Sequence, residues 1–146
     1  DHADIAKALA VLRALGPHDV GQAVVAARGY VLAVEAAEGT DAMLRRCAGL
    51  RQWGLSQRHG VLVKIPKPGQ ELRVDMPVIG PRTAELAAAA GLAGMAVAKG
   101  AVLLAEPQAL VETADKLGLF VVGVDPLAEV SAPGGAAPER ASSEAD

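Results

Sequence analysis

Two clusters of charged residues have the types and spacing that phosphoryl-transfer chemistry requires. Glu35, Glu38 and Asp41 lie three residues apart, between the expected end of a strand and the expected start of a helix. The segment 64–81, KIPKPGQELRVDMPVIGP, combines basic and acidic side chains with prolines that stiffen it. Carboxylates bind hard cations such as Mg2+, whereas lysine, arginine and helix N-termini bind phosphate oxygens. Together the two clusters are typical of a site that acts on a phosphate group.

Each cluster also has a simpler interpretation. Thr40 or Asp41 can cap a helix, and a loop of mixed charges is more often a solvated surface than a site. Glu35 ends an apolar run and can face solvent. Cys47, at helix-core spacing, is interpreted as a small hydrophobic side chain rather than a nucleophile. The three histidines lie beside turns or the terminus without a second ligand at metal-binding spacing, and we expect them at the surface.

The composition indicates one folded domain and excludes several classes of protein. Apolar residues make up 51% of the 146 residues, which is enough for a single core. The net charge of −3 and the aromatic content of 2% argue against a nucleic-acid partner. The single cysteine excludes an internal disulfide, and no uncharged run is long enough for a membrane span. We assign residues 1–130 to the domain and 131–146, which lack large apolar side chains, to a disordered tail.

The apolar pattern predicts helices that alternate with short strands. The expected helices are 4–15, 41–50, 83–90 and 107–117, and the expected strands are 22–27, 30–36, 61–65, 72–75, 94–98, 101–106 and 119–124. The first two strands and the pair 94–98 and 101–106 each read as a hairpin, Thr83 reads as an N-cap, and strands 22–27, 30–36 and 119–124 read as buried. Such interleaving predicts an α/β fold, with a mixed β-sheet covered by helices on both faces in three layers.

The strings around both clusters resemble a known enzyme family. The most specific are EGTD at 38–41, KPxQ at 67–70 and RxDxPxIGPxT at 73–83, within a similarity that runs from about residue 4 to 124. They resemble the C-terminal domain of the UDP-2,3-diacylglucosamine pyrophosphatases of the bacterial lipid A pathway, of the type found in alphaproteobacteria. These enzymes are distinct from the calcineurin-like metallophosphoesterases that perform the same step elsewhere.

The resemblance implies a two-domain enzyme that hydrolyses UDP-2,3-diacylglucosamine with Mg2+. Water attacks the α-phosphorus on the uridine side and releases UMP and 2,3-diacylglucosamine 1-phosphate (lipid X). A nucleotide-binding domain, absent from this chain, contacts the UDP part, and the present domain holds the lipid X part. The amphipathic substrate implies a cytoplasmic protein in peripheral contact with the inner membrane, and a homo-oligomer is compatible with the resemblance.

The resemblance also implies roles for individual residues. The catalytic candidates are Asp75, Asp41 and Glu71; the substrate-binding candidates are Gly39, Thr40, Lys67, Gln70 and Arg73; and the metal-binding candidates are Asp75, Asp41 and Glu38. Glu71 stands where the family has aspartate, so Asp75 and Asp41 rank ahead of it. Two alternatives stay open: a metal-free site in which lysine and arginine carry all the charge stabilisation, and a module that binds or senses a phosphorylated glycolipid without catalysis.

Overall fold

The fold is described from a computed structural model, which covers residues 2–50, 58–67 and 76–127. The elements, in chain order, are α1 (His2–Leu15), a 3-10 turn (Gly16–His18), β1 (Ala23–Ala27), β2 (Tyr30–Val34), α2 (Thr40–Leu50), β3 (Val61–Lys64), β4 (Val78–Ile79), α3 (Pro81–Ala89), β5 (Gly94–Ala98), β6 (Leu103–Leu104), α4 (Pro107–Leu117) and β7 (Phe120–Val124). The expected strand 72–75 and the expected tail 131–146 lie outside the described residues.

One sheet organises the molecule, and most of its strands point the same way. Its order is β2-β1-β3-β5-β7, with β1 antiparallel to both neighbours and the pairs β3–β5 and β5–β7 parallel. Because β1 is antiparallel to both β2 and β3, β2 runs in the same direction as β3, β5 and β7. The last residues of these four strands therefore lie along one border of the sheet. We call this border the carboxyl edge; it is distinct from the outer strands, β2 and β7.

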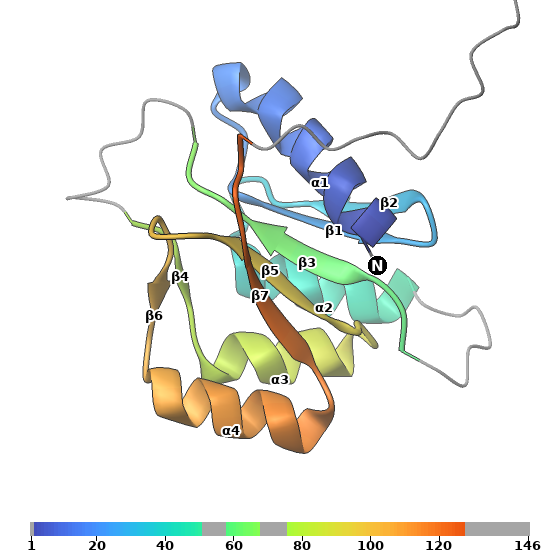
Figure 1. Ribbon diagram of the computed structural model, residues 1–146. Coiled ribbons are helices and arrows are strands. Elements are labelled where there is room, and N and C mark those ends of the chain that lie inside the picture. Colours follow the sequence, from blue (N-terminus) through green and yellow to red (C-terminus); the bar gives the residue numbers. More distant parts are fainter. Residues whose placement is uncertain (1, 51–57, 68–75, 128–146) are drawn as a thin grey trace, which may run out of the picture.

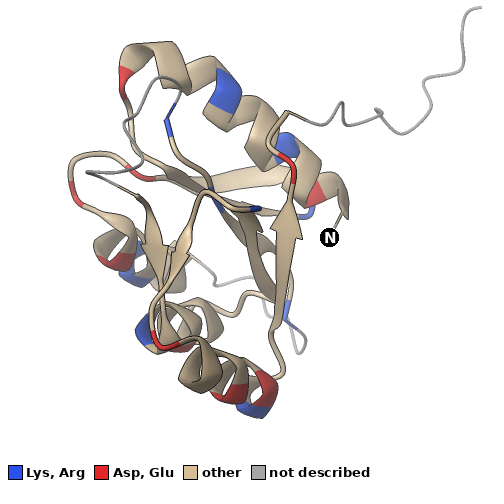
Figure 2. Ribbon diagram, turned by 60° about the vertical axis from the view of Figure 1, so that its left-hand side comes forward, with Lys and Arg blue, Asp and Glu red and all other residues tan. Residues whose placement is uncertain are grey.

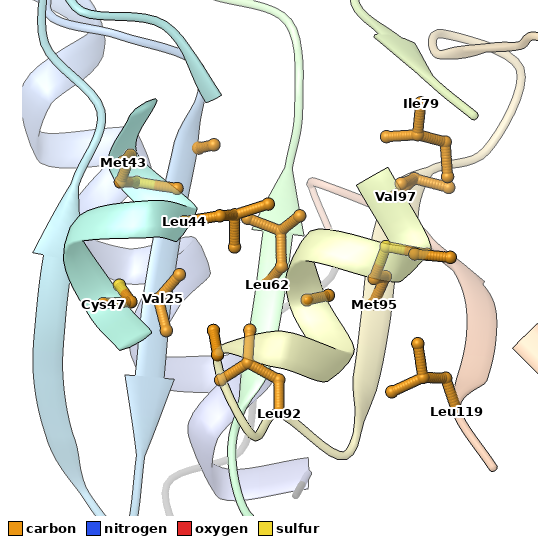
Figure 3. Close-up of a cluster of buried hydrophobic side chains, with 14 of the residues drawn as sticks. Val25, Met43, Leu44, Cys47, Leu62, Ile79, Leu92, Met95, Val97 and Leu119 are labelled. Atoms are coloured by element: carbon orange, nitrogen blue, oxygen red, sulfur yellow. The ribbon is translucent and has the colours of Figure 1, made fainter. Parts of the chain in front are cut away.

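Helices cover both faces of this sheet, so the predicted three-layer α/β fold is confirmed (Figure 1). Helix α1 packs on one face, against β1 and β3. Helices α2, α3 and α4 lie on the other face, over a core that includes Met43, Leu44, Leu62 and Met95 (Figure 3). Within the described ranges, no helix is both long enough and apolar enough to cross a membrane.

Cys47 belongs to the core beneath α2. Its side chain is fully buried beside Val25 and Leu44 (Figure 3). Burial raises the pKa of the Cys47 thiol, an effect that the nearby Arg46 partly opposes. A thiol with a raised pKa is a poor nucleophile at neutral pH, so the interpretation of Cys47 as a core residue is confirmed.

The first hairpin is confirmed and is fastened to α1. Its two turn residues, Arg28 and Gly29, both have a positive φ, of 52° and 81°, as tight hairpin turns require. The Asp4 carboxylate accepts hydrogen bonds from both of their backbone N–H groups, at 3.3 and 2.9 Å. The first turn of α1 thereby fixes the turn between β1 and β2.

The prediction that 94–98 and 101–106 form a second hairpin is wrong. Strand β5 has β3 on one side and β7 on the other, so no edge of β5 is left for the following segment. That segment forms only β6, which pairs in parallel with β4 as a separate two-stranded sheet. Two apolar runs around a glycine look alike in sequence whether or not they pair with each other.

The prediction of burial is right for β1 but wrong for β2 and β7. All five residues of β1 are buried, as its position between β2 and β3 requires. Strands β2 and β7 instead form the two edges of the sheet, where Tyr30 is 65% exposed and Val122 is 39% exposed. An apolar sequence does not reveal whether its strand has one neighbour or two.

The predicted N-cap at Thr83 is also wrong, because α3 begins two residues earlier. Gly80 occupies the N-cap position and Pro81 the first turn. Thr83 lies in that turn, and its Oγ1 accepts a hydrogen bond from the Gly80 N–H at 3.1 Å. The hydroxyl thus satisfies a backbone donor at the helix start from inside the helix rather than from before it.

Removal of this buried hydroxyl should lower stability by a modest amount. We expect Thr83→Ala to reduce the free energy of unfolding by about 1 kcal/mol, because the Gly80 N–H loses its acceptor. Thr83→Ser, which keeps the oxygen, should lose less. Urea titrations of the three proteins measure the difference, and equal losses for Ala and Ser would show that the methyl group rather than the hydroxyl matters.

Candidate functional site

The carboxyl edge brings together segments that are far apart in the sequence. The segment Glu35–Asp41, which we call the acidic turn, follows β2 and includes the first two residues of α2. Strand β3 ends at this edge with Lys64, and Lys67 follows it. Figure 2 shows that the strands themselves carry little charge and that the charged residues gather on the helices and at strand ends. The sheet therefore concentrates ionisable groups at its periphery.

The acidic turn is held by contacts within itself and beneath it. Glu35 is only 9% exposed, and its Oε2 accepts a hydrogen bond from Thr40 Oγ1 at 2.6 Å. The simpler interpretation, in which Glu35 only faces solvent, is therefore wrong. Gly21 lies so close under the Glu35 backbone that a Cβ there would come within 1.9 Å of the Glu35 carbonyl oxygen. Gly39, with a φ of 86°, allows the chain to reverse before α2.

Asp41 connects the first turns of two helices. Its Oδ2 lies 3.1 Å from Nε of Arg82, in the first turn of α3. Both side chains are substantially exposed, so this ion pair adds little to stability. Glu38 instead pairs with Arg46 of α2, at 2.5 Å. Sequence reasoning missed Arg82, since nothing in the sequence indicates that α2 and α3 begin side by side.

Lys64 is the other residue at this edge that sequence reasoning did not single out as a site residue. It is 8% exposed, and its Nζ donates a hydrogen bond to the Val78 carbonyl oxygen at 2.9 Å. Burial lowers the pKa of Lys64, and the charges of Glu35 and Asp41 oppose that shift. A signal was present in the sequence, because a lysine inside the apolar run VLVKI must be buried or must reach past its neighbours.

The lowered pKa of Lys64 predicts a pH-dependent stability. Between that pKa and the ordinary value of 10.5, the unfolded chain binds more protons than the folded one, so the free energy of unfolding rises with pH. Urea titrations at a series of pH values up to 10.5 should show this rise in the wild type relative to Lys64→Met, because the raised pKa of Cys47, which lowers stability as the pH rises above 9.0, is common to both proteins. Identical pH dependences of the two proteins would contradict the assignment.

A polar cleft opens beside the acidic turn. It has a volume of about 430 Å³ and is lined by residues 19–22, by 35–37 and by Lys67. Lys67 Nζ lies 2.9 Å from Asp19 Oδ1 at this cleft. The cleft thus has two acidic residues, Asp19 and Glu35, and one basic residue, Lys67, on its walls, and Lys67 is paired with Asp19.

The structure brings only some of the candidate residues together. Gly39, Thr40 and Asp41 lie at the start of α2, and Lys67 lies on the cleft beside the same turn. Glu38 shares the acidic turn, but its carboxylate is paired with Arg46. Gln70, Glu71, Arg73 and Asp75 lie outside the described residues.

The described residues leave the expected magnesium site a prediction. Among residues 2–50, 58–67 and 76–127, no three or more His, Cys, Asp or Glu side chains are grouped closely enough to hold a metal ion. Mg2+, however, usually needs only one or two carboxylates, with water and substrate phosphates as its other ligands. Of the expected ligands, Asp41 and Glu38 lie in the described part of the chain, and each is paired with an arginine.

Comparison with known proteins identifies the relatives of this chain. Residues 1–122 match a family described as "LpxI C-terminal domain". The chain belongs to this family. It is also 55% identical over 127 residues to the UDP-2,3-diacylglucosamine pyrophosphatase LpxI of Caulobacter vibrioides. That similarity covers 85% of the present chain but only 45% of the relative, so the chain spans less than half of the relative's length. The resemblance found in the sequence is therefore confirmed at the level of the family.

Proposed function

We propose that this chain is the catalytic and lipid X-binding part of a UDP-2,3-diacylglucosamine pyrophosphatase of the lipid A pathway. The observation that carries the proposal is that residues 35–37 of the acidic turn and Lys67 line one polar cleft at the carboxyl edge. The name of the Caulobacter relative supports the choice of UDP-2,3-diacylglucosamine as the substrate. In the proposed reaction, water forms a bond to the α-phosphorus, the bond from that phosphorus to the bridging oxygen breaks, and lipid X leaves with that oxygen.

The chain's own residues have complementary roles in this proposal. Asp75 and Asp41 orient the attacking water and accept its proton, with Glu71 as a further candidate. Lys67 and Arg73 stabilise the charge that develops on the phosphoryl oxygens. The backbone at Gly39 and Thr40, together with Gln70, binds the phosphate. The Thr40 hydroxyl is already committed to Glu35, which keeps the start of α2 in place for that contact.

A magnesium ion fits this scheme with carboxylates of the same segments. Asp75 and Asp41, with Glu38 as a third candidate, are the proposed ligands. When bound, Mg2+ supplies Lewis-acid stabilisation of the phosphoryl oxygens. Chelation is therefore expected to abolish hydrolysis and added Mg2+ to restore it. An initial rate that chelation leaves unchanged would favour the metal-free alternative.

The proposal includes a second domain and a membrane-bound substrate. Because the chain spans 45% of its Caulobacter relative, we place a nucleotide-binding domain for the UDP part in the remainder of such a protein. We further propose that the reaction takes place in the cytoplasm at the surface of the inner membrane, where the acyl chains of the substrate would be anchored. Full activity of the present chain alone would contradict a site shared between two domains.

The direct test is hydrolysis in isotopically labelled water. The two-domain protein is incubated with UDP-2,3-diacylglucosamine in detergent micelles and ¹⁸O-labelled water, and both products are analysed by mass spectrometry. We expect the label in UMP, since water attacks the α-phosphorus. Label in lipid X would contradict this direction of attack. Binding of substrate without release of UMP would favour the non-catalytic glycolipid-binding module.

A further inference from the structure

Strand β7 is an outer strand of the sheet, and its free side is apolar and regular (Figure 1). Among the described strands it pairs only with β5, in an unbroken parallel register. None of its residues, Phe120–Val124, is charged, and Val121 and Val122 are exposed. Natural proteins protect such strands with charges, prolines or bulges, because an unpaired row of backbone groups can bind another strand. Within its own sequence, β7 has none of these protections.

The opposite outer strand, β2, is protected by a bulge. Successive residues of β1 pair with Ala33 and then with Val31, so Leu32 of β2 has no partner on β1. A bulge of this kind bends the strand and interrupts its row of backbone groups. Of the two outer strands, β7 is therefore the one that can accept another strand.

The backbone of β7 directs its unpaired groups away from the sheet. The Phe120 N–H donates a hydrogen bond to the Ala93 carbonyl oxygen, at 3.1 Å, on the side of β5. Backbone polar groups point to alternate sides along a strand, so those of Val121 and Gly123 point to the outer side of β7. These two residues are the ones that a further strand would contact through hydrogen bonds.

Two apolar hollows flank β7, one on each face of the sheet. The hollow on the face of α1 has a volume of about 340 Å³ and is lined by His2, Ile5, Phe120 and Val122. A groove of about 340 Å³ lies on the other face beside α4, and its exposed apolar side chains are Leu104, Val111, Val121 and Val122. A strand added to β7 would direct alternate side chains over the two hollows. The surroundings of β7 therefore fit an extended apolar partner.

A second copy of β7 fits this surface in one antiparallel register. When Val122 of each copy lies on a two-fold axis, Val121 of one copy lies opposite Gly123 of the other. The backbone groups that point outward then face each other as hydrogen-bonded pairs. At Gly123 the incoming valine meets the aliphatic stem of Lys99, whose Cγ lies 2.8 Å from where a glycine Cβ would be. The strand is thus complementary to itself in both backbone and side chains.

The charges beside β7 are also complementary in this register. Lys99 lines the groove at the end of β7 that lies at the carboxyl edge. Asp115 lies at the other end, on the same face of α4 as Val111, because residues four apart on a helix are neighbours. Lys116 lies on the adjacent face, together with Glu112. The antiparallel register therefore brings Lys99 of each copy to Asp115 of the other, so opposite charges meet twice.

We infer that β7 is the contact surface of a two-fold symmetric dimer of this chain, in which two sheets join through their β7 strands. The inference goes beyond the proposed function and does not depend on it. The apolar patch is small, which is typical of a reversible dimer rather than an obligate one. The acidic turn follows β2, at the opposite side of the sheet, so the dimer leaves the polar cleft of each copy open. The rate of hydrolysis per chain is therefore expected to be the same in monomer and dimer.

The first test measures the monomer–dimer equilibrium of the two-domain protein by analytical ultracentrifugation over a range of concentrations. We expect Val122→Lys, which places two like charges on the two-fold axis, to raise the Kd of the dimer by about 100-fold or more. The matched control, Tyr30→Lys, places the same charge on β2 and should leave Kd within about twofold of the wild type. A wild-type protein that stays monomeric, or a dimer that Val122→Lys leaves intact, would overturn the inference.

A charge exchange tests the register and also decides the case in which Val122→Lys does not fold. Lys99→Asp alone and Asp115→Lys alone should each raise Kd by about tenfold, because like charges then meet twice. In a mixture of these two variants, opposite charges meet at both ends again, so a heterodimer with nearly wild-type affinity is expected. Sedimentation of one fluorescently labelled variant in the presence of the other measures this affinity. A mixed dimer no tighter than the dimers of the separate variants would overturn the inference.

Discussion

Asp75→Asn is expected to lower the rate of UMP release by about 10²–10⁴-fold, the usual contribution of a general base. The amide has nearly the shape of the carboxylate but can neither accept the proton of water nor carry a negative charge. Affinity for lipid X should change little, since the proposed contacts to its phosphate come from Lys67, Arg73 and the start of α2. Initial rates and isothermal titration with lipid X measure the two quantities.

The control for this variant is Asp115→Asn, which makes the same chemical change on the exposed surface of α4. It should leave both the rate and the affinity for lipid X unchanged. An Asp75→Asn protein with the rate of the wild type would remove Asp75 from the catalytic group. If the wild-type protein binds lipid X but does not hydrolyse the substrate, the chain is the non-catalytic binding module.

Gly21→Ala is expected to be among the most damaging single substitutions in the described part of the chain. The added Cβ would lie 1.9 Å from the carbonyl oxygen and 2.6 Å from the carbonyl carbon of Glu35, and backbone atoms cannot rotate away. The positive φ of 29° adds strain to the substituted residue. We expect a loss of about 3 kcal/mol or more in the free energy of unfolding, a large share of a typical domain's stability.

Gly29→Ala is the matched control. Gly29 also has a positive φ, of 81°, but a Cβ there would meet nothing within 4 Å. It should therefore cost only about 1 kcal/mol, the penalty of the backbone conformation. Urea unfolding of both variants measures the difference. Equal losses would show that the contact between Gly21 and Glu35 does not constrain the acidic turn.

Local sequence signals were sufficient for most elements of the fold. Pro107 begins α4 and Gly118 ends it with a positive φ of 68°, as their usual positions predict. The pair Arg28 and Gly29 likewise predicts the tight turn of the first hairpin. Strand order, by contrast, depends on contacts between distant segments. The same apolar character therefore fits β5 in the interior of the sheet and β7 at its edge.

The candidate site was predictable to a similar extent. The acidic turn was found from carboxylate spacing, and its place at the start of α2 is confirmed. Lys64 belonged to the charged segment 64–81 but was not chosen as a site residue, although its apolar neighbours in VLVKI indicate burial. Arg82 was missed because only the tertiary structure shows that α2 and α3 begin side by side. Asp75 and its neighbours from 68 to 74 stay a prediction.

Because β2, β3, β5 and β7 run in the same direction, their first residues all lie on the side of the sheet opposite the candidate site. Tyr30 begins β2 at the edge opposite Glu35, and its side chain is 65% exposed. The chain has one cysteine, Cys47, which is fully buried. A Tyr30→Cys variant would therefore accept a maleimide dye or a surface tether at a single accessible thiol, one strand length from the acidic turn. Such a label could follow the protein on lipid bilayers while the cleft stays unobstructed.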